Sequence, residues 1–354
     1  MIGVRLDNEI LDRIVEIEKC RERFGGVKLP VGISSKLRKN SKKKSSYASV
    51  KIEGNPLSEN EAGEAIESSK RHFLKPEQEV RNYYAALEFL EKALKAKRPF
   101  SRELVLDVQK LVVWGESSEK TGIRGPMPPG VLFAVYDEAT GRPEYIPPES
   151  KDIGPLLDEL IAYVNTSDDH PILKAAVVHY QLVTIHPFED GNGRTARLMS
   201  DYVLDYYDYG FQNIGSLEEY FAYDIDEYYR SLQMGLPPLF YDGRDNPPHP
   251  EVWIKYFLRM MEFYAKKAVE ISMKSAADRA SASLSHLGIK ERRFHEYLAK
   301  RKVSAFAPIE MAKAMKVSNR TIINWCAALC KVGFLEPEMS GSRIRSYRVL
   351  GARI

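Results

Sequence analysis

Cysteine is scarce in this sequence of 354 residues, which contains Cys20, Cys326 and Cys330. Three scattered cysteines cannot build a disulfide framework, so we predict a reducing compartment, the cytoplasm. Cys326 and Cys330 share one face of a helix by their spacing, but no second pair completes a zinc site. We expect both to behave as small apolar side chains.

Long apolar runs and a strong charge of one sign are missing too. No run of about 18 apolar residues is present to span a membrane. The N-terminus does not combine a basic start with an apolar core, so no signal peptide is evident. The formal net charge of +3 does not by itself predict nucleic-acid binding. The length allows two or three domains with a sizeable core.

The most informative stretch is residues 186–197, which reads His-Pro-Phe-Glu-Asp-Gly-Asn-Gly-Arg-Thr-Ala-Arg. His186 stands where a largely apolar helix, expected over 170–185, runs out. A histidine can accept a proton at neutral pH, because its ordinary pKa is about 6.5. Asp190 could hold Mg²⁺, which is usually bound by one or two carboxylates and the phosphates of a substrate.

The second half of the stretch is suited to anions. Gly191, Asn192 and Gly193 form a turn that feeds a helix, whose free N–H groups and dipole attract negative charge. Arg194 and Arg197 lie three residues apart, so both can face one side of that helix and bind phosphate oxygens. A lone histidine or a lone Gly-Asn-Gly is usually a loop or a turn. The whole set describes nucleotidyl or phosphoryl transfer.

This stretch reproduces the Fic signature, His-Pro-Phe-x-(Asp/Glu)-Gly-Asn-Gly-Arg-x-x-Arg, without a departure, so the sequence resembles Fic proteins. The resemblance implies a mainly α fold, a Fic helical core with a β-hairpin flap, and transfer of AMP from ATP, with Mg²⁺, to a Ser, Thr or Tyr hydroxyl of a target protein or of itself. It makes His186 the catalytic base and Asp190 the metal ligand. Phe188 is expected to pack inward and Glu189 to face solvent. The implied nucleotide-binding residues in the stretch are Gly191, Asn192, Gly193, Arg194 and Arg197.

A segment before the core carries a second pattern. Residues 45–54 are expected to form a short helix, and a capping box at Ser58 and Glu61 predicts a second helix over about 59–73. Ser49-x-x-x-Glu53-Gly54 fits the inhibitory helix of one class of Fic proteins. The resemblance implies that Glu53 pairs with Arg197 and keeps it from the γ-phosphate of ATP. The alternative for Glu53 is a solvated surface residue.

A basic run lies just upstream of this segment. It contains Lys36, Arg38, Lys39, Lys42, Lys43 and Lys44. We predict a solvated loop, with a nucleic-acid patch as the alternative.

Two further features bear on ligands. Extended residues 131–136 and 144–146 around a turn at 137–142 predict a β-hairpin. Fic proteins place such a hairpin over the active site as a flap, which holds the target by strand addition. A plain surface hairpin is the alternative. Tyr228 and Tyr229 are either residues of a core helix or, as the resemblance implies, part of the adenosine pocket. Leu236 replaces an asparagine found in some relatives. His170 and His179 are expected to be structural.

The C-terminal part has a different pattern. A helix over 309–315, a turn, a helix from Ser318 to 330 and two extended segments suggest a winged-helix domain. Its cations could face DNA phosphates, or the domain could mediate protein contacts and a homodimer. These cations are Arg320, Lys331, Arg343, Arg345 and Arg348.

We therefore predict four regions. They are an N-terminal helical region with the inhibitory helix (1–97), a Fic catalytic core (98–240), a helical linker (241–288) and a winged-helix-like domain (289–354). Three rival interpretations of the function remain open. They are phosphoryl transfer or AMP removal at the same site, a winged-helix DNA-binding regulator with the Fic core as a nucleotide sensor, and a toxin silenced by its own helix.

Overall fold

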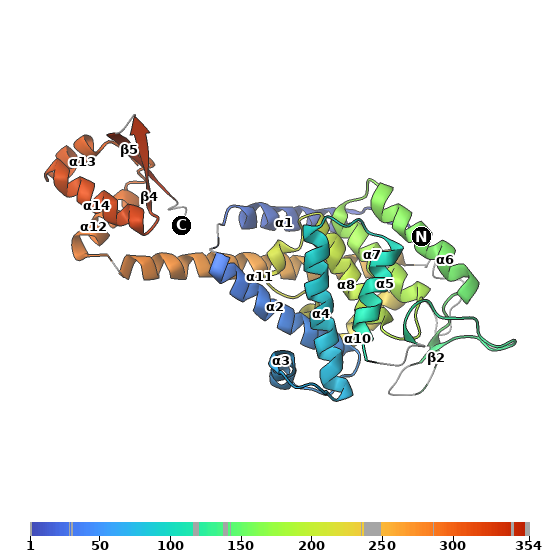
Figure 1. The fold of residues 1–354 in the computed structure, drawn as a ribbon. Coiled ribbons are helices and arrows are strands. Elements are labelled where there is room, and N and C mark those ends of the chain that lie inside the picture. Colours follow the sequence, from blue (N-terminus) through green and yellow to red (C-terminus); the bar gives the residue numbers. More distant parts are fainter. Residues whose placement is uncertain are drawn as a thin grey trace. The chain divides into compact units, whose positions relative to one another are not determined.

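A computed structural model describes residues 2–27, 29, 31–115, 120–136, 141, 143–234, 236, 249–285, 287–340 and 343–350. The chain forms two compact units, Met1–Ser272 and Met273–Ile354, and is mainly helical (Figure 1). Among the described residues, no helix combines the length and apolar character that a membrane span requires.

The first unit is built from helices around a buried central pair, α7 and α8. Its elements are α1 (Asn8–Gly25), α2 (Val31–Ile52), α3 (Glu59–Glu67), α4 (Lys75–Lys95), α5 (Arg102–Val112), β1 (Val135–Tyr136), β2 (Pro143–Tyr145), α6 (Ser150–Thr166), α7 (Pro171–Ile185), α8 (Asn192–Tyr206), the short 3₁₀ helix η2 (Phe211–Asn213), α9 (Glu218–Tyr223), α10 (Ile225–Gln233) and the first part of α11 (Pro250–Ser285).

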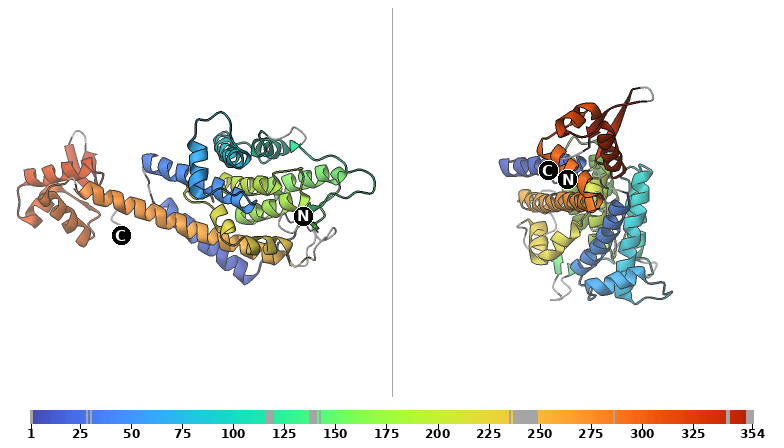
Figure 2. Two further views of the ribbon diagram at one scale, coloured as in Figure 1. Left: turned by 90° about the horizontal axis from the view of Figure 1, so that it is seen from below. Right: turned by 90° about the vertical axis from the view of Figure 1, so that its left-hand side faces the viewer.

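Helix α7 is apolar around its circumference and is buried on nearly all sides, as its sequence predicts. It packs against α8 and α6, while α8 also contacts α2, α4 and α5. Figures 1 and 2 show α7 and α8 running through the middle of this unit. The ends of α7 and α8 that flank residues 186–192 are therefore held by a rigid core.

Helix α2 corrects two predictions. The expected loop over residues 36–44 and the short helix over 45–54 are one helix, Val31–Ile52. Its lysines are good helix formers, and their ammonium groups pair with carboxylates on other elements. The Nζ–carboxylate distances are 3.2 Å for Lys42 and Glu91, 2.7 Å for Lys43 and Glu67, and 2.8 Å for Lys44 and Glu219.

The capping box that opens α3 is present. Ser58 Oγ accepts from the Glu61 N–H at 3.4 Å, and the Glu61 carboxylate accepts from the Ser58 N–H at 2.8 Å. The helix ends at Glu67 instead of near residue 73. Arg81 of α4 donates to the carbonyl oxygens of Ala65 and Ser68, at 2.6 and 3.0 Å, which satisfies the end of the shorter helix.

The predicted hairpin is present but short. Strand β1 pairs antiparallel with β2, with Val135 opposite Tyr145 and Tyr136 opposite Pro143. Most of the predicted turn, residues 137–140 and 142, lies outside the described residues. The Tyr145 hydroxyl donates to the Thr184 carbonyl near the end of α7, which attaches the hairpin to the core.

The second unit has its own apolar core and a three-stranded antiparallel sheet of order β3-β5-β4. Ser318 caps α14, as predicted, by accepting from the Thr321 N–H at 3.1 Å, and Cys326 is buried. Helix α12 and strand β3 were not predicted. The elements, besides the end of α11, are α12 (Ile289–Lys300), β3 (Ala305–Phe306), α13 (Pro308–Met315), α14 (Asn319–Lys331), β4 (Leu335–Ser340) and β5 (Arg343–Val349).

One of the predicted cations of this unit has an acidic partner. Arg348 pairs with Glu338 at 2.7 Å. A winged-helix role in binding DNA or protein stays a prediction.

Candidate active site

His186 is the residue that ends helix α7. Its backbone is left-handed, with φ of 48°, and its N–H donates to the Leu182 carbonyl at 3.2 Å. Its Nδ1 lies 3.2 Å from the Val183 carbonyl oxygen. A carbonyl can only accept, so Nδ1 carries the hydrogen and Nε2 keeps the lone pair that a base needs. Burial lowers the pKa of His186 to about 4, so the imidazole is neutral at neutral pH.

A loop before the hairpin fixes the backbone around His186. The N–H of Arg124 donates to the Pro187 carbonyl at 2.9 Å, and Arg124 Nε donates to the His186 carbonyl at 2.8 Å. The Arg124 side chain also donates to the Pro148 carbonyl, and the residue is 3% exposed. Sequence reasoning missed Arg124, because no local pattern links it to residues 186–188.

Loss of the Arg124 side chain should slow any reaction that needs His186 as a base. We expect Arg124→Ala to lower kcat by about tenfold, the order of one lost hydrogen bond to a charged group, with little effect on nucleotide affinity. Steady-state kinetics and nucleotide titration on the folded variant would measure the two quantities. Equal losses in kcat and affinity would point instead to a general collapse of the site.

Phe188 and Glu189 lie as predicted. Phe188 is 1% exposed, and an isolated antiparallel bridge joins it to Ile123. Glu189 is exposed. Asn192 ties the loop together, since its side chain accepts from the Phe188 N–H at 3.0 Å and donates to the Phe188 carbonyl at 2.9 Å. Because the Asn192 side chain is engaged in this way, its backbone N–H is the group that could bind an anion.

Asp190 lies between two cations. Its carboxylate is 2.7 Å from Arg194 Nη2 and 3.0 Å from Lys120 Nζ. Burial alone would raise the pKa of Asp190, but the two cations keep it below its ordinary value. The buried Gln109 donates to the Lys120 and Asp190 carbonyls at 2.8 and 3.2 Å. Neither Lys120 nor Gln109 was identified from the sequence.

The two glycines of the turn lie close to other side chains. Gly191 has φ of 81°, and a Cβ at this position would lie 3.0 Å from Val112 and 3.1 Å from Val113. A Cβ on Gly193 would lie 2.4 Å from Glu53 Oε1. The backbone at the start of α8 is therefore open to close approach by an oxygen of another group.

Arg194 has hydrogen-bond donors to spare. The residue is 4% exposed, and its Nη2 is engaged by Asp190. Its Nε and Nη1 are buried and have no partner among the described residues. Buried charged donors without a partner are costly. An anionic ligand at the start of α8 would remove that cost.

Arg197 is held largely by helix α2. The predicted ion pair is present, with Arg197 Nη2 donating to Glu53 Oε1 at 2.5 Å. Ser49 accepts from Arg197 Nε through its hydroxyl at 2.8 Å and from Nη2 through its carbonyl at 3.0 Å. Arg197 is 1% exposed and Glu53 is 33% exposed on their side chains. The serine and the glutamate of the Ser-x-x-x-Glu pattern thus bind one guanidinium.

The two tyrosines have different surroundings. Tyr228 is 1% exposed, and its hydroxyl lies 3.4 Å from Arg197 Nη1. Tyr229 is 42% exposed, and its hydroxyl donates to the Ile52 carbonyl of α2 at 3.3 Å. The ring surface that a nucleoside could reach therefore belongs to Tyr229 and not to Tyr228.

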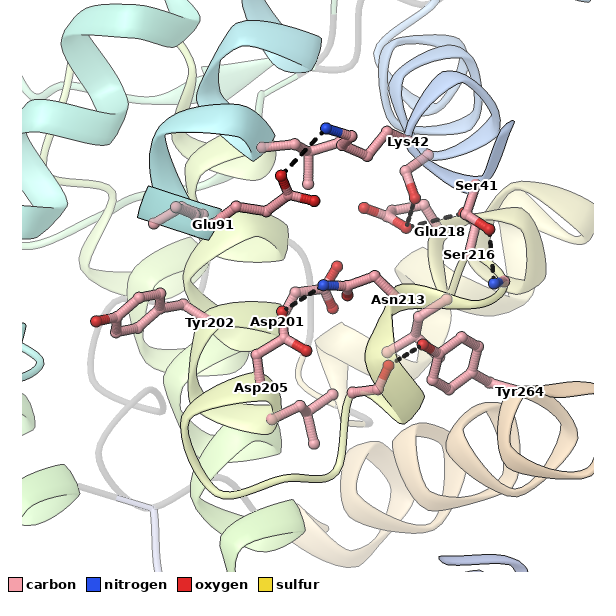
Figure 3. A pocket seen from close by; sticks show the side chains of 17 residues that line it. Ser41, Lys42, Glu91, Asp201, Tyr202, Asp205, Asn213, Ser216, Glu218 and Tyr264 are labelled. Atoms are coloured by element: carbon pink, nitrogen blue, oxygen red, sulfur yellow. Dashed lines mark hydrogen bonds and ion pairs between the residues drawn. The ribbon is translucent and has the colours of Figure 1, made fainter. Parts of the chain in front are cut away.

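A small cavity of about 40 Å³ lies further along α8, between α2, α4 and α9. Figure 3 shows the carboxyl groups of Asp201, Asp205 and Glu218 turned toward one another in it. Glu218 accepts from Ser45, Tyr83 and Ser216, at 2.8, 2.8 and 2.9 Å. Burial and then Glu218 and Asp205 raise the pKa of Asp201 well above its ordinary value.

The carboxyl group of Asp205 in this cavity should make the stability of the folded chain depend on pH. Burial raises the pKa of Asp205 to about 7, whereas an aspartate in an unfolded chain titrates near about 3.9. The folded chain thus binds the proton more tightly, so this residue costs no stability at low pH and costs progressively more as the pH rises to about 7. Asp205→Asn should raise the melting temperature above pH 7, with a difference that vanishes toward about pH 4.

Thermal unfolding across this pH range would test the effect. The control is Asp168→Asn, because Asp168 is exposed and does not line the cavity. We expect this control to melt like the parent at each pH. A gain from Asp205→Asn that is the same at every pH would contradict the explanation.

Comparison with protein families and with curated proteins identifies the type of domain. Residues 99–204 match the model of the Fic/DOC family. The protein adenylyltransferase fic-1 of Caenorhabditis elegans is 33% identical over 164 residues, which are 45% of this chain and 30% of that protein. Protein adenylyltransferase Fic of Culex quinquefasciatus is 29% identical over 165 residues, 45% of this chain and 31% of that protein. The chain thus matches less than a third of the length of these relatives.

Solved structures are similar over more of the chain. A Fic family protein from Desulfovibrio desulfuricans has a TM-score of 0.62 at 19% identity and covers 99% of this chain and 98% of its own. Fic-1 from Caenorhabditis elegans (aa134–508) has a TM-score of 0.58 at 20% identity, with 76% and 73% covered. The fold is therefore mainly α with a Fic-type core.

Proposed function

We propose that this chain is a protein adenylyltransferase that its own helix α2 holds inactive. The observation that carries the proposal is Arg194, whose buried Nε and Nη1 have no partner among the described residues. Arg194 lies in the first turn of α8, directly after the glycine turn, and it follows the acidic Asp190 by four residues. The Fic/DOC match over residues 99–204 and the adenylyltransferase names of the relatives support the choice of AMP transfer.

His186 is the proposed general base. Its Nε2 lone pair accepts the proton of a Ser, Thr or Tyr hydroxyl as the hydroxyl oxygen bonds to the α-phosphorus of ATP. The bond from the α-phosphorus to the bridging oxygen breaks, and pyrophosphate leaves with those electrons. The low pKa of His186, caused by burial, keeps the imidazole neutral at neutral pH, so Nε2 holds a lone pair and not a proton.

The phosphates would be bound by the start of α8. The N–H groups of Asn192 and Gly193 offer donors at a helix N-terminus. The Gly191 N–H donates to Asp190 Oδ1 and would join them if that contact opened. Arg194 would bind through its free donors, and Arg197 would bind the β- and γ-phosphates once it leaves Glu53. Tyr229 is the proposed adenosine contact, since Tyr228 has almost no exposed surface.

Asp190 is the proposed ligand of Mg²⁺. The described residues contain no group of three or more side chains that could hold a metal ion by themselves. Mg²⁺ usually combines one or two carboxylates with substrate phosphates, and Asp190 is such a carboxylate. When bound, Mg²⁺ would neutralise charge that develops on the phosphates. The Lys120 ammonium, 3.0 Å from Asp190, would have to move aside.

Inhibition would follow from the position of Glu53. Its carboxylate lies against Gly193, where a Cβ would come within 2.4 Å of Oε1, and it binds Arg197. Glu53 thus puts negative charge where phosphate oxygens would bind and removes a cation that they need. ATP would then bind weakly or in an unproductive pose.

The hairpin is the proposed docking site for the target. Its strand β1 lies next to His186 in the chain's fold, because the ring of Phe133, just before β1, is 6.0 Å from the imidazole by ring centroids. An extended target segment could add to the hairpin through main-chain hydrogen bonds. The target could also be this chain itself.

Identifying the group that is transferred to protein would test the proposal. The purified Glu53→Gly protein, with and without cell lysate, would be incubated with Mg²⁺ and ATP labelled at the α- or the γ-phosphate. Label from the α-phosphate, with the mass of an adenylyl group on the product, is the expected result. Label from the γ-phosphate alone would identify phosphoryl transfer. Release of AMP from a previously adenylylated protein would identify AMP removal.

A further inference from the structure

Arg197 has hydrogen-bond partners of two kinds. Among the described residues, Ser49 and Glu53, on and just after helix α2, accept from its Nε and Nη2. Its Nη1 donates to the hydroxyl of Tyr228 on α10, at 3.4 Å. If α2 withdraws to release the site, Tyr228 is the described partner that remains.

The hydroxyl of Tyr228 is itself held. It lies 2.8 Å from His179 Nε2. A guanidinium can only donate, so the tyrosine oxygen accepts from Arg197 and its own hydrogen is left for His179. Burial lowers the pKa of His179 well below its ordinary value, so the neutral ring can accept at Nε2. The hydrogen bonds thus run in one direction, from Arg197 through Tyr228 to His179.

His179 is a poor choice for packing alone. It is fully buried, and its ring lies among aromatic side chains, with centroid distances of 5.5 Å to Phe221, 4.8 Å to Trp253 and 6.2 Å to Phe257. Its Nδ1 has no hydrogen-bond partner among the described residues. An apolar ring would avoid that cost. Within the described part of the chain, the polar contact of the His179 ring is the one to Tyr228.

We propose that Tyr228 and His179 are positioning residues, which hold Arg197 in place for the polyphosphate of ATP after α2 has moved away. In this role Tyr228 acts through its hydroxyl and not as a nucleoside platform. His179 acts through Tyr228 and touches no substrate. The inference rests on the proposed function, because it assigns Arg197 to the β- and γ-phosphates.

The experiment uses the full chain with Glu53→Gly, so that Arg197 is not bound by the carboxylate. ATP and AMP affinities would be measured by titration calorimetry, and KM and kcat by AMP transfer. We expect Tyr228→Phe to weaken ATP binding and raise KM about tenfold, the order of one hydrogen bond to a charged group. AMP affinity should not change, because AMP lacks the β- and γ-phosphates.

Four further variants separate positioning from packing. His179→Phe should weaken ATP binding like Tyr228→Phe, and the two together should be no worse than Tyr228→Phe alone. His179→Gln, which keeps an acceptor, should recover part of the affinity. Tyr256→Phe is the control, because Tyr256 belongs to the same aromatic cluster and its buried hydroxyl has no hydrogen-bond partner among the described residues.

The outcomes distinguish this inference from the proposed function. Unchanged ATP affinity in Tyr228→Phe, or equal losses for ATP and AMP, would overturn the positioning role while leaving AMP transfer intact. Tight ATP binding without transfer to any protein would overturn the proposed function, and the effect of Tyr228→Phe on ATP affinity would still support positioning. Failure of the Glu53→Gly chain to bind ATP would overturn both.

Discussion

His186→Ala is expected to bring AMP transfer below detection. A positioned base contributes about 10²–10⁴ in rate, and His186 is fixed on both sides, by Val183 at Nδ1 and by Arg124 at its carbonyl. ATP affinity should stay near that of the parent, because the imidazole is not one of the proposed phosphate donors. Transfer of α-label to protein and ATP titration would measure the two properties.

Glu189→Ala is the matched control for this variant. Glu189 belongs to the same loop but is exposed, so its loss should leave transfer nearly unchanged. Near-normal transfer by His186→Ala would contradict the assignment of the base. A parallel loss of ATP affinity would mean that the loop itself had rearranged.

Glu53→Gly is expected to raise the rate of AMP transfer about 10- to 100-fold. This range corresponds to the contribution of about 1.5–3 kcal/mol from one hydrogen bond to a charged group, here the 2.5 Å contact with Arg197. The change removes the carboxylate from Arg197, whose contacts with Ser49 remain, and it also clears the space beside Gly193. Initial rates at saturating ATP, together with ATP affinity, would measure the effect.

Two further variants test whether the charge of Glu53 causes the inhibition. Glu53→Gln keeps the size but removes the charge, so it should be intermediate between the parent and Glu53→Gly. Glu59→Ala removes an exposed carboxylate at the start of α3 and should have no effect. Adding His186→Ala to Glu53→Gly should silence the variant. A rate for Glu53→Gly equal to that of the parent would refute inhibition by Glu53.

The predictions that the structure bears out rest on residues close together in the chain. The capping box at Ser58 and Glu61 spans four residues, and the apolar pattern of α7 predicts a buried helix. The end of that helix brings His186 to the start of the glycine turn, so the 186–197 stretch is assembled by local geometry. The pairing of Glu53 with Arg197 came from the Fic resemblance and not from any property of the residues between them.

The wrong prediction of a loop over residues 36–44 also has a physical cause. The basic run over residues 36–44 looked like a loop because its charges had no visible partners. In the fold, the partners are Glu67 on α3, Glu91 on α4 and Glu219 on α9. Carboxylates from distant parts of the chain let the lysines lie along one helix, and a sequence window contains only one half of each pair.

The sequence by itself determined which chemistry is available: a base, a carboxylate, a glycine turn and two arginines within twelve residues. The tertiary structure alone decided which of these groups are engaged and by what. It brought Lys120 to Asp190, Arg124 to His186, and Tyr228 with His179 to Arg197. The physical reason is that hydrogen bonds and charge pairs act over a few ångströms in space, whereas these partners are separated in sequence by distances that no local pattern encodes.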